Sequence, residues 1–261
     1  MIDRLRRLIF GGVRVREVEG PAWPDETRVT EDLEGVRFEP ATPNVWLDHV
    51  TMRRVDFAGF RFQRLYADDC RFIGCDFSRV RVDWLPFGSG GSLFRDCRFD
   101  GASIGDFGDV RLERCQFVDT DLEGWFTFAA DIVDCRFAGR LSGVVFNGED
   151  DTGRRKNEFR GNDFREADLD DVAFRFGIDL GAQRLPEGPE YVRLRNVAAS
   201  IEAVRANVTE HPEAVQMLDL VEDVYTGEED VFTKRAFVVE LADSPEVGER
   251  VVDLLVQASS T

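Results

Sequence analysis

The sequence predicts a mainly β fold: a solenoid built from repeated coils, followed by a small, mainly helical C-terminal region. Three observations support this prediction. Each of the five cysteines stands two residues before a phenylalanine, as in Cys115-Gln116-Phe117. Large apolar residues recur at five-residue steps through about half of the 261 residues. Beyond residue 190 the five-residue step is lost, and apolar residues take the spacing of helices.

The five-residue step places apolar residues in two columns. One column holds a large residue, and the other holds a small or β-branched residue two positions earlier. Neither the period of a helix nor the alternation of a flat strand produces this pattern. We expect both columns to point into the core. The predicted core residues are Phe57, Phe72, Phe77, Phe99, Phe117, Phe137, Phe159, Phe164, Leu169, Cys70, Cys75, Cys97, Cys115 and Cys135.

A longer period indicates the length of one coil. Phe77, Phe99, Phe117, Phe137 and Phe159 are separated by 22, 18, 20 and 22 residues. Four five-residue faces therefore make one coil, and we expect these five rings to stack along the solenoid. Repeats of this kind are stable because neighbouring coils share a core. The cysteines expected to stack beside the rings are Cys75, Cys97, Cys115 and Cys135.

The repeat unit Ala167-Asp168-Leu169-Asp170-Asp171 and the Cys-x-Phe units resemble the repeats of the pentapeptide-repeat family. The resemblance covers about residues 45–180, with three irregular segments inside this range. It implies a right-handed, quadrilateral β-helix in which the large central residue and the small residue point inward. Some members of that family resemble duplex DNA in width and negative charge, and they inhibit or protect DNA gyrase by occupying its DNA saddle.

The repeat divides the chain into three segments. Residues 1–44 contain no repeat and several prolines, and we expect them to cap the first coil. A docking helix for a partner within this segment is the alternative, and residues 1–10 are basic and amphipathic. Residues 45–180 form the predicted β-helix, and residues 181–261 form the mainly helical C-terminal region.

The C-terminal region has more than one apolar stripe with helical spacing. Ser244-Pro245 predicts a helix start, because the hydroxyl caps free amides and proline suits the first turn. Residues 237–241 fit a helix or a strand equally well. The stripe expected to cover the last coil is Val215, Leu218, Val221 and Val224. The stripe expected to pair with a second copy, giving a homodimer, is Val247, Val251, Leu254 and Leu255. A self-contained helical domain on a monomer is the alternative.

The formal charge of −18 divides into −2, −7 and −9 over the three segments. Such acidity argues against direct binding to nucleic acid or an anionic membrane, and it favours a cationic partner. No apolar run reaches the roughly 20 residues that cross a bilayer. The apolar stretch near the N-terminus is shorter than the core of a signal peptide. Cysteines at inward positions indicate reduced thiols, so we expect a cytoplasmic protein.

Residues that carry chemistry are scarce. The cysteine spacings of 5, 22, 18 and 20 do not match zinc sites, which need convergent thiolate pairs or histidines. His49 and His211 are the only histidines, and no catalytic triad is suggested. The glycine-rich segment 88–91 lacks the ending of a phosphate loop. Acidic pairs such as Asp68-Asp69 and Asp170-Asp171 are typical of a solvated face. We expect no enzymatic activity, cofactor or metal.

Two functional hypotheses follow. The first is a non-enzymatic protein-interaction module, a rigid acidic solenoid that binds a protein partner. The second comes from the resemblance: a DNA mimic that inhibits or protects DNA gyrase or another type II topoisomerase. Against the second, residues 45–180 interleave 19 basic residues with 26 acidic ones. Catalysis by the C-terminal region is a third reading, and no nucleophile–base pair or metal cluster supports it.

Overall fold

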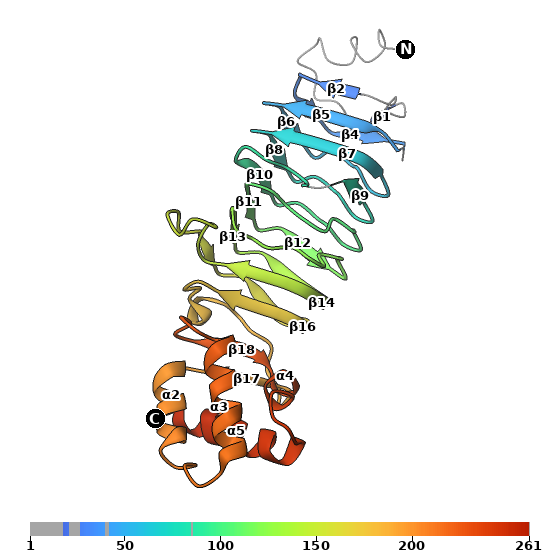
Figure 1. The fold of residues 1–261 in the computed structure, drawn as a ribbon. Coiled ribbons are helices and arrows are strands. Elements are labelled where there is room, and N and C mark those ends of the chain that lie inside the picture. The colour runs from blue at the N-terminus through green and yellow to red at the C-terminus, as the bar shows by residue number, and fades with distance from the viewer. Residues whose placement is uncertain (1–17, 21–26, 40–41, 85, 261) are drawn as a thin grey trace.

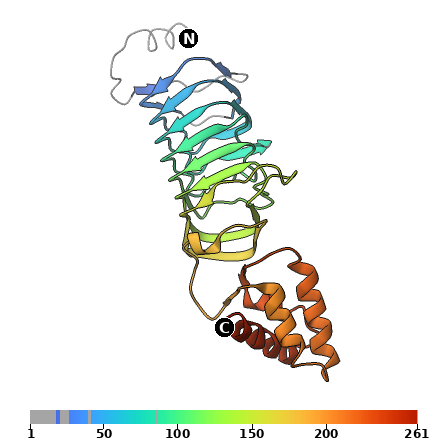
Figure 2. The same ribbon diagram turned by 90° about the vertical axis from the view of Figure 1, so that its left-hand side faces the viewer.

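The protein is an elongated β-solenoid that ends in a small helical region. The structure is a computed structural model that describes residues 18–20, 27–39, 42–84 and 86–260. Stacked coils form a rod, and the helices lie at its C-terminal end (Figures 1 and 2). The predicted fold class is confirmed.

Parallel sheets run along the rod. The largest has the strand order β15-β13-β11-β10-β8-β6-β3. Its strands are β3 (Leu33–Glu34), β6 (Thr51–Arg53), β8 (Arg71–Ile73), β10 (Ser92–Arg95), β11 (Val110–Glu113), β13 (Ala130–Val133) and β15 (Phe159–Arg160). The second has the order β2 (Thr27–Val29), β5 (Asn44–Asp48), β7 (Arg61–Asp68) and β9 (Arg81–Trp84). The third has the order β12 (Gln116–Val118), β14 (Arg136–Asn147) and β16 (Asp163–Arg175). A separate two-stranded sheet pairs β1 (Val18–Gly20) with β4 (Val36–Phe38).

A sharp corner after each short strand explains the five-residue step. Gly74, Asp96 and Arg114 occupy equivalent corners, with φ angles of 64°, 56° and 50°. This left-handed conformation turns the chain abruptly, and glycine and aspartate adopt it more readily than most residues. Each unit of five therefore uses part of its length for the corner and the rest for a strand.

The solenoid starts earlier in the chain than we expected. Residues 27–38 contain strands that pair in parallel with β5 and β6, so they form a coil where we expected a cap within residues 1–44. The Phe38 ring stacks on Phe57, with centroids 6.1 Å apart. These strands have two or three residues each, which is too short to show the repeat in the sequence. The basic, amphipathic residues 1–10, which bear on the alternative of a docking helix, lie outside the described residues.

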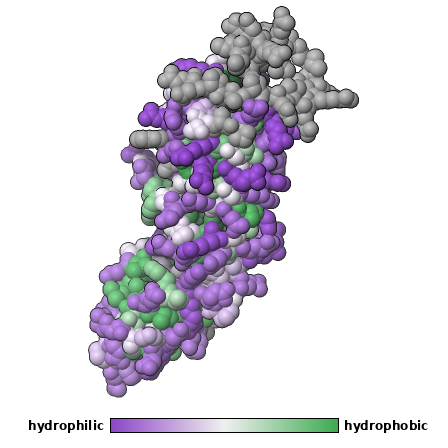
Figure 3. Space-filling model, turned by 90° about the vertical axis from the view of Figure 1, so that its right-hand side faces the viewer, coloured by the Kyte–Doolittle hydropathy of each residue, from purple (hydrophilic) through white to green (hydrophobic). Residues whose placement is uncertain are grey.

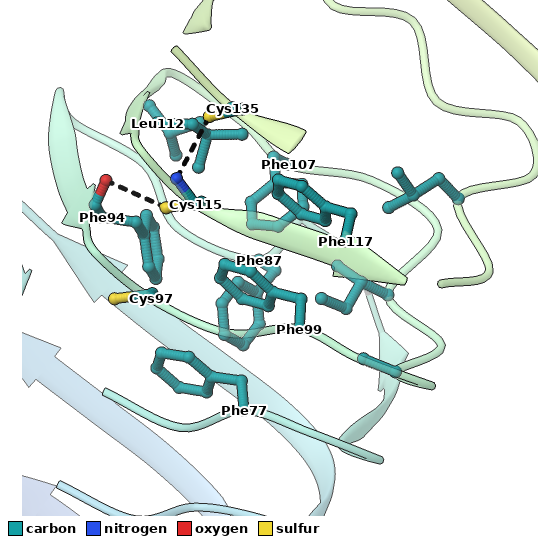
Figure 4. Packing of buried hydrophobic residues seen from close by; sticks show 14 of the residues in the cluster. Phe77, Phe87, Phe94, Cys97, Phe99, Phe107, Leu112, Cys115, Phe117 and Cys135 are labelled. Carbon is teal, nitrogen blue, oxygen red and sulfur yellow. Dashed lines mark hydrogen bonds between the residues drawn. The ribbon is translucent and has the colours of Figure 1, made fainter. Parts of the chain in front are cut away.

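Two aromatic columns fill the solenoid. Every residue of the predicted core is at most 7% exposed. Figure 4 shows Phe77, Phe99 and Phe117 above one another, with Cys97 and Cys115 beside them. The parallel ring pairs, with centroids 4.7 to 5.1 Å apart, are Phe57–Phe77, Phe77–Phe99, Phe99–Phe117, Phe117–Phe137 and Phe137–Phe164.

One member of the expected ring stack is different. The Phe137 ring stacks on Phe164 at 4.7 Å, where we expected Phe159. Phe159 pairs with Ile132 in the seven-stranded sheet and belongs to the other column. The segment between β14 and β15 lengthens this coil, so the 22-residue step from Phe137 reaches the wrong face.

The cysteines continue from coil to coil as buried free thiols. The Cys115 N–H donates to the Cys135 sulfur at 3.4 Å. The Cys135 N–H donates to Oδ1 of Asn162 at 3.0 Å, so an asparagine takes the next place in the column. Cys70 lies in the other column, where its N–H donates to the Ser92 hydroxyl. The cysteines therefore serve packing in two separate columns.

The C-terminal region combines a two-stranded antiparallel sheet with helices. A short 3-10 helix, η1 (Leu180–Ala182), precedes it. The sheet pairs β17 (Tyr191–Leu194) with β18 (Val231–Lys234). The helices are α2 (Val197–Arg205), α3 (Pro212–Val224), α4 (Arg235–Val239) and α5 (Pro245–Ala258). The Ser244 hydroxyl caps α5 by accepting from the Val247 N–H. Most of the ambiguous segment 237–241 is helical.

The β17–β18 sheet, and not the stripe on α3, covers the last coil. Phe232 of β18 belongs to the solenoid core and stacks on Tyr191 of β17 at 5.3 Å. The Tyr191 hydroxyl accepts from the Leu169 N–H at 3.1 Å. Leu218 and Val221 of the expected stripe are fully buried among the helices. A coil end exposes backbone N–H groups, and the β17–β18 sheet offers an oxygen acceptor together with rings.

Candidate functional site

The described residues contain no constellation for catalysis. Within them, no group of three or more His, Cys, Asp or Glu side chains could hold a metal ion. His49 is exposed beside Asp48 and Asp69, and its hydrogen bond with Asp48 raises its pKa. His211 lies 3.6 Å from Glu213. In the described ranges, no helix has both the length and the apolar character needed to span a membrane.

Charged side chains of both signs lie on the flanks of the rod. One outward column crosses successive coils beside the ring stack. Asp56 in this column forms an ion pair with Arg37 at 3.1 Å. Asp163 pairs with Arg165 at 2.6 Å and lies 3.7 Å from Arg184. The column reads Arg37, Asp56, Asp76, Arg98, Gln116, Arg136, Asp163 and Arg184. This flank is therefore mixed in charge and not uniformly negative.

An ion-pair network joins the coils on the seven-stranded sheet. Arg111 lies 2.6 Å from both Glu113 and Glu158, and 3.3 Å from Asp131. Arg155 also reaches Asp131, at 3.1 Å. Hydrogen bonds from Arg111 and a second arginine hold the pKa of Glu158 below its usual range. These carboxylates are committed to arginines of the same chain, which leaves little unpaired negative charge on this face.

The stripe expected to pair with a second copy does not form a free face. Val251 and Leu255 are 1% and 0% exposed, and Val247 and Leu254 are partly buried. All four pack in the helical core, where α5 contacts α2, α3 and α4. Val251 and Leu255 therefore hold the C-terminal region together, and pairing of this stripe with a second copy stays a prediction.

A cavity of about 400 Å³ opens where the solenoid meets its cover. Its walls come from the end of β16, from β18, from α4 and from Tyr225. Phe174 and Phe232 are apolar wall residues, and Phe237 is 41% exposed. Figure 3 shows apolar residues gathered on the helical end of the molecule. Sequence reasoning missed this cavity, although the acidic pair Asp170-Asp171 and the ambiguous segment 237–241 both contribute lining residues.

No family model matches this chain, and no curated protein matches it. The chain is similar in fold to solved structures of QnrB1, described as a plasmid-mediated fluoroquinolone resistance protein. Two trypsin-treated variants show 16% and 15% identity, cover 60% and 61% of this chain and 92% and 91% of theirs, and have TM-scores of 0.20. The full-length protein shows 14% identity, covers 60% of this chain and 94% of its own, and has a TM-score of 0.15. At these values the similarity carries no argument about function.

Proposed function

We propose that this chain is a non-enzymatic protein-interaction module of the pentapeptide-repeat type, a rigid solenoid that binds a cationic protein partner. The observation that carries this proposal is the distribution of charge. Residues 181–261 hold 16 acidic residues against 7 basic ones, whereas on the rod carboxylates such as Glu113 and Glu158 pair with arginines. Uncompensated negative charge steers positively charged proteins toward this end.

The solenoid suits such a role mechanically. Its coils share one continuous core of stacked rings, so the rod is stiff and holds its C-terminal end at a fixed place. A cytoplasmic location and the absence of a cofactor belong to the same proposal.

Affinity capture with charge variants tests the proposal. The full chain is immobilised beside a variant with Glu240→Gln, Asp243→Asn and Glu246→Gln, all exposed on the C-terminal region. A second variant with Asp68→Asn, Asp96→Asn and Asp119→Asn, all exposed on the rod, removes the same number of charges and is the matched control. We expect a basic protein to be retained by the full chain and by the control, and lost with the C-terminal variant. Equal retention by all three proteins would refute the charge argument.

A DNA mimic that acts on gyrase is the second candidate, and the net charge of −18 favours it. The spacing of charge opposes it. Duplex DNA carries one negative charge per about 1.7 Å of axis. Coils about 4.8 Å apart, with ion-paired carboxylates, cannot match that density on these flanks. A supercoiling assay with purified gyrase decides: inhibition or quinolone protection at micromolar protein supports the mimic, and the lack of both excludes it.

A further inference from the structure

Backbone hydrogen bonds join each coil to the next in a regular pattern. The N–H of a central residue donates to the following coil, as from Phe99 to the Gln116 carbonyl at 2.8 Å. On another face the Thr127 N–H donates to the Val145 carbonyl at 3.0 Å. In return, the Val145 N–H donates to the Trp125 carbonyl at 2.9 Å. Each face thus presents one donor and, two residues earlier, one acceptor to its successor.

Among the residues that the structure describes, no further coil follows the last one. Other parts of the chain supply hydrogen-bond acceptors for most of its faces instead. The Phe164 N–H donates to the Arg184 carbonyl at 2.7 Å, and the Leu169 N–H donates to the Tyr191 hydroxyl. The Phe176 N–H donates to the Glu228 carboxylate at 3.2 Å. Each of these three N–H donors therefore has its own acceptor in the segments that cover the last coil.

One face of the last coil is left open. Phe174 pairs with Phe146, and Val172 pairs with Val144, on the side of β14. By the pattern of the earlier coils, the Phe174 N–H and the Val172 carbonyl point away from β14. No residue in the described part of the chain forms a hydrogen bond with either group on that side. Buried backbone groups are almost always paired, so an unpaired donor and acceptor in register are unusual.

The open face borders the cavity. Val172, Phe174 and Arg175 line it from β16, and Phe232 faces them from β18. Tyr225, a residue that is 6% exposed, also lines the cavity. The cavity thus combines apolar walls with a backbone donor and a backbone acceptor that lack partners.

The charges at the cavity favour a basic occupant. Lys234 forms an ion pair with Asp168 at 2.7 Å, and Arg175 lies 3.9 Å from Glu228, so both cations have acidic neighbours. Asp171 and Glu240 also line the cavity, and both are exposed without an ion pair to any described residue. The free charges at this site are therefore negative.

We propose that this cavity binds an extended peptide of a cationic protein partner, which adds as a strand to β16 beside Val172 and Phe174. A peptide N–H donates to the Val172 carbonyl, and the carbonyl of the same peptide residue accepts from the Phe174 N–H. An apolar side chain enters between Phe174 and Phe232, and flanking lysine or arginine faces Asp171 and Glu240. Strand addition of this kind takes its affinity from the main chain and its specificity from pockets. The inference rests on the proposed role in partner binding.

The preceding coil supplies the probe. Residues 143–146 (Gly-Val-Val-Phe) add to the coil before them as the peptide would add to β16. Val145 makes both backbone bonds there, to Trp125 and Thr127. The probe is an end-blocked, fluorescein-labelled peptide, Lys-Gly-Val-Val-Phe-Lys. One matched control carries an N-methyl group on the second valine, which removes the donor to Val172. The other replaces both lysines with glutamate.

Fluorescence anisotropy with the full chain measures binding. We expect saturable binding of the probe, at least fivefold weaker binding of the N-methyl peptide, and still weaker binding of the glutamate peptide at low salt. Ala236→Trp fills the cavity from α4 and should abolish binding, whereas Leu220→Ala, exposed on α3 and outside the cavity, should not change it. Circular dichroism checks the fold of both variants.

Hydrogen exchange tests the open face directly. The Phe174 amide should exchange faster than the equivalent Phe146 amide in the free protein and slow down when the probe binds. Equal protection of both amides, equal affinity of the methylated peptide, or no saturable binding at millimolar probe would overturn the proposal. If these tests fail while charge-dependent capture of a partner succeeds, the proposed function stands and only this site is refuted.

Discussion

The rings of Phe117 and Phe137 lie parallel, with centroids 4.8 Å apart and planes 6° apart. Phe99 stacks on the opposite side of Phe117 at 4.9 Å. Phe117→Ala should therefore lower the free energy of unfolding by about 3–5 kcal/mol, because stiff neighbouring coils cannot close the space. Urea unfolding at equilibrium measures the loss. Phe126→Ala is the control, since that ring is 51% exposed and its removal should cost less than about 1 kcal/mol. An unchanged urea midpoint for the Phe117 variant would contradict the ring stack.

Asn157 holds the long segment between β14 and β15 against the rod. Its Nδ2 donates to the carbonyls of Thr127, Phe128, Asn147 and Glu149 at 2.9 to 3.2 Å. Asn157→Asp should cost about 3 kcal/mol or more near neutral pH, because a buried carboxylate would face carbonyl oxygens.

The pH dependence of this variant has a definite sign. Its carboxyl pKa in the folded state should lie above the unfolded value, so the protonated form is favoured and stability falls as pH rises through this range. Asn157→Ala loses the same donor without adding charge, so its penalty should not change with pH. Urea midpoints from about pH 4 to about pH 7 distinguish the two variants, and parallel curves would contradict the assignment of Nδ2 as the donor.

The fork between Asp163 and Arg165 predicts a second pH effect. Hydrogen bonds from the Arg165 guanidinium, at 2.6 and 2.9 Å, lower the pKa of Asp163 to about 2. A carboxyl pKa that is lower in the folded protein than in the unfolded chain stabilises the fold at pH values above the unfolded pKa. This stabilisation is lost as pH falls toward 2. Asp163→Asn should cost less than about 1 kcal/mol near neutral pH, because the pair is partly exposed to solvent. The difference from the natural protein should shrink in acid, and a constant difference would exclude the ion pair as its cause.

Leu255 on α5 is fully buried in the core of the C-terminal helices. Leu255→Ala should destabilise the C-terminal region by about 2–5 kcal/mol, as for other buried leucines. Because this side chain serves the core of its own domain, the mass from light scattering should be the same for both proteins. Thermal unfolding followed by far-ultraviolet circular dichroism measures the stability. A change from dimer to monomer with unchanged stability would instead support the predicted pairing of two copies through this stripe.

The sequence determined the solenoid and its inward columns. Phe77, Phe99 and Phe117 obey a rule that repeats in every coil, because each coil must offer its neighbours a ring at the same place. Such a rule is local, since it needs only five residues to express and about twenty to return to the same face. The burial of Cys97 and Cys115 follows from the same rule. The loss of the five-residue step beyond residue 190 likewise predicts a separate helical region.

Only the tertiary structure decided what the irregular parts contact. The segment before Phe159 hides the coil register, so Phe164 takes the place expected for Phe159. The stripe containing Leu255 could be recognised as apolar, but its spacing does not say whether the partner is another helix or another copy. The open Phe174 N–H has no sequence signature at all. Every residue except proline carries the same backbone donor, and only the path of distant segments decides which donors are paired.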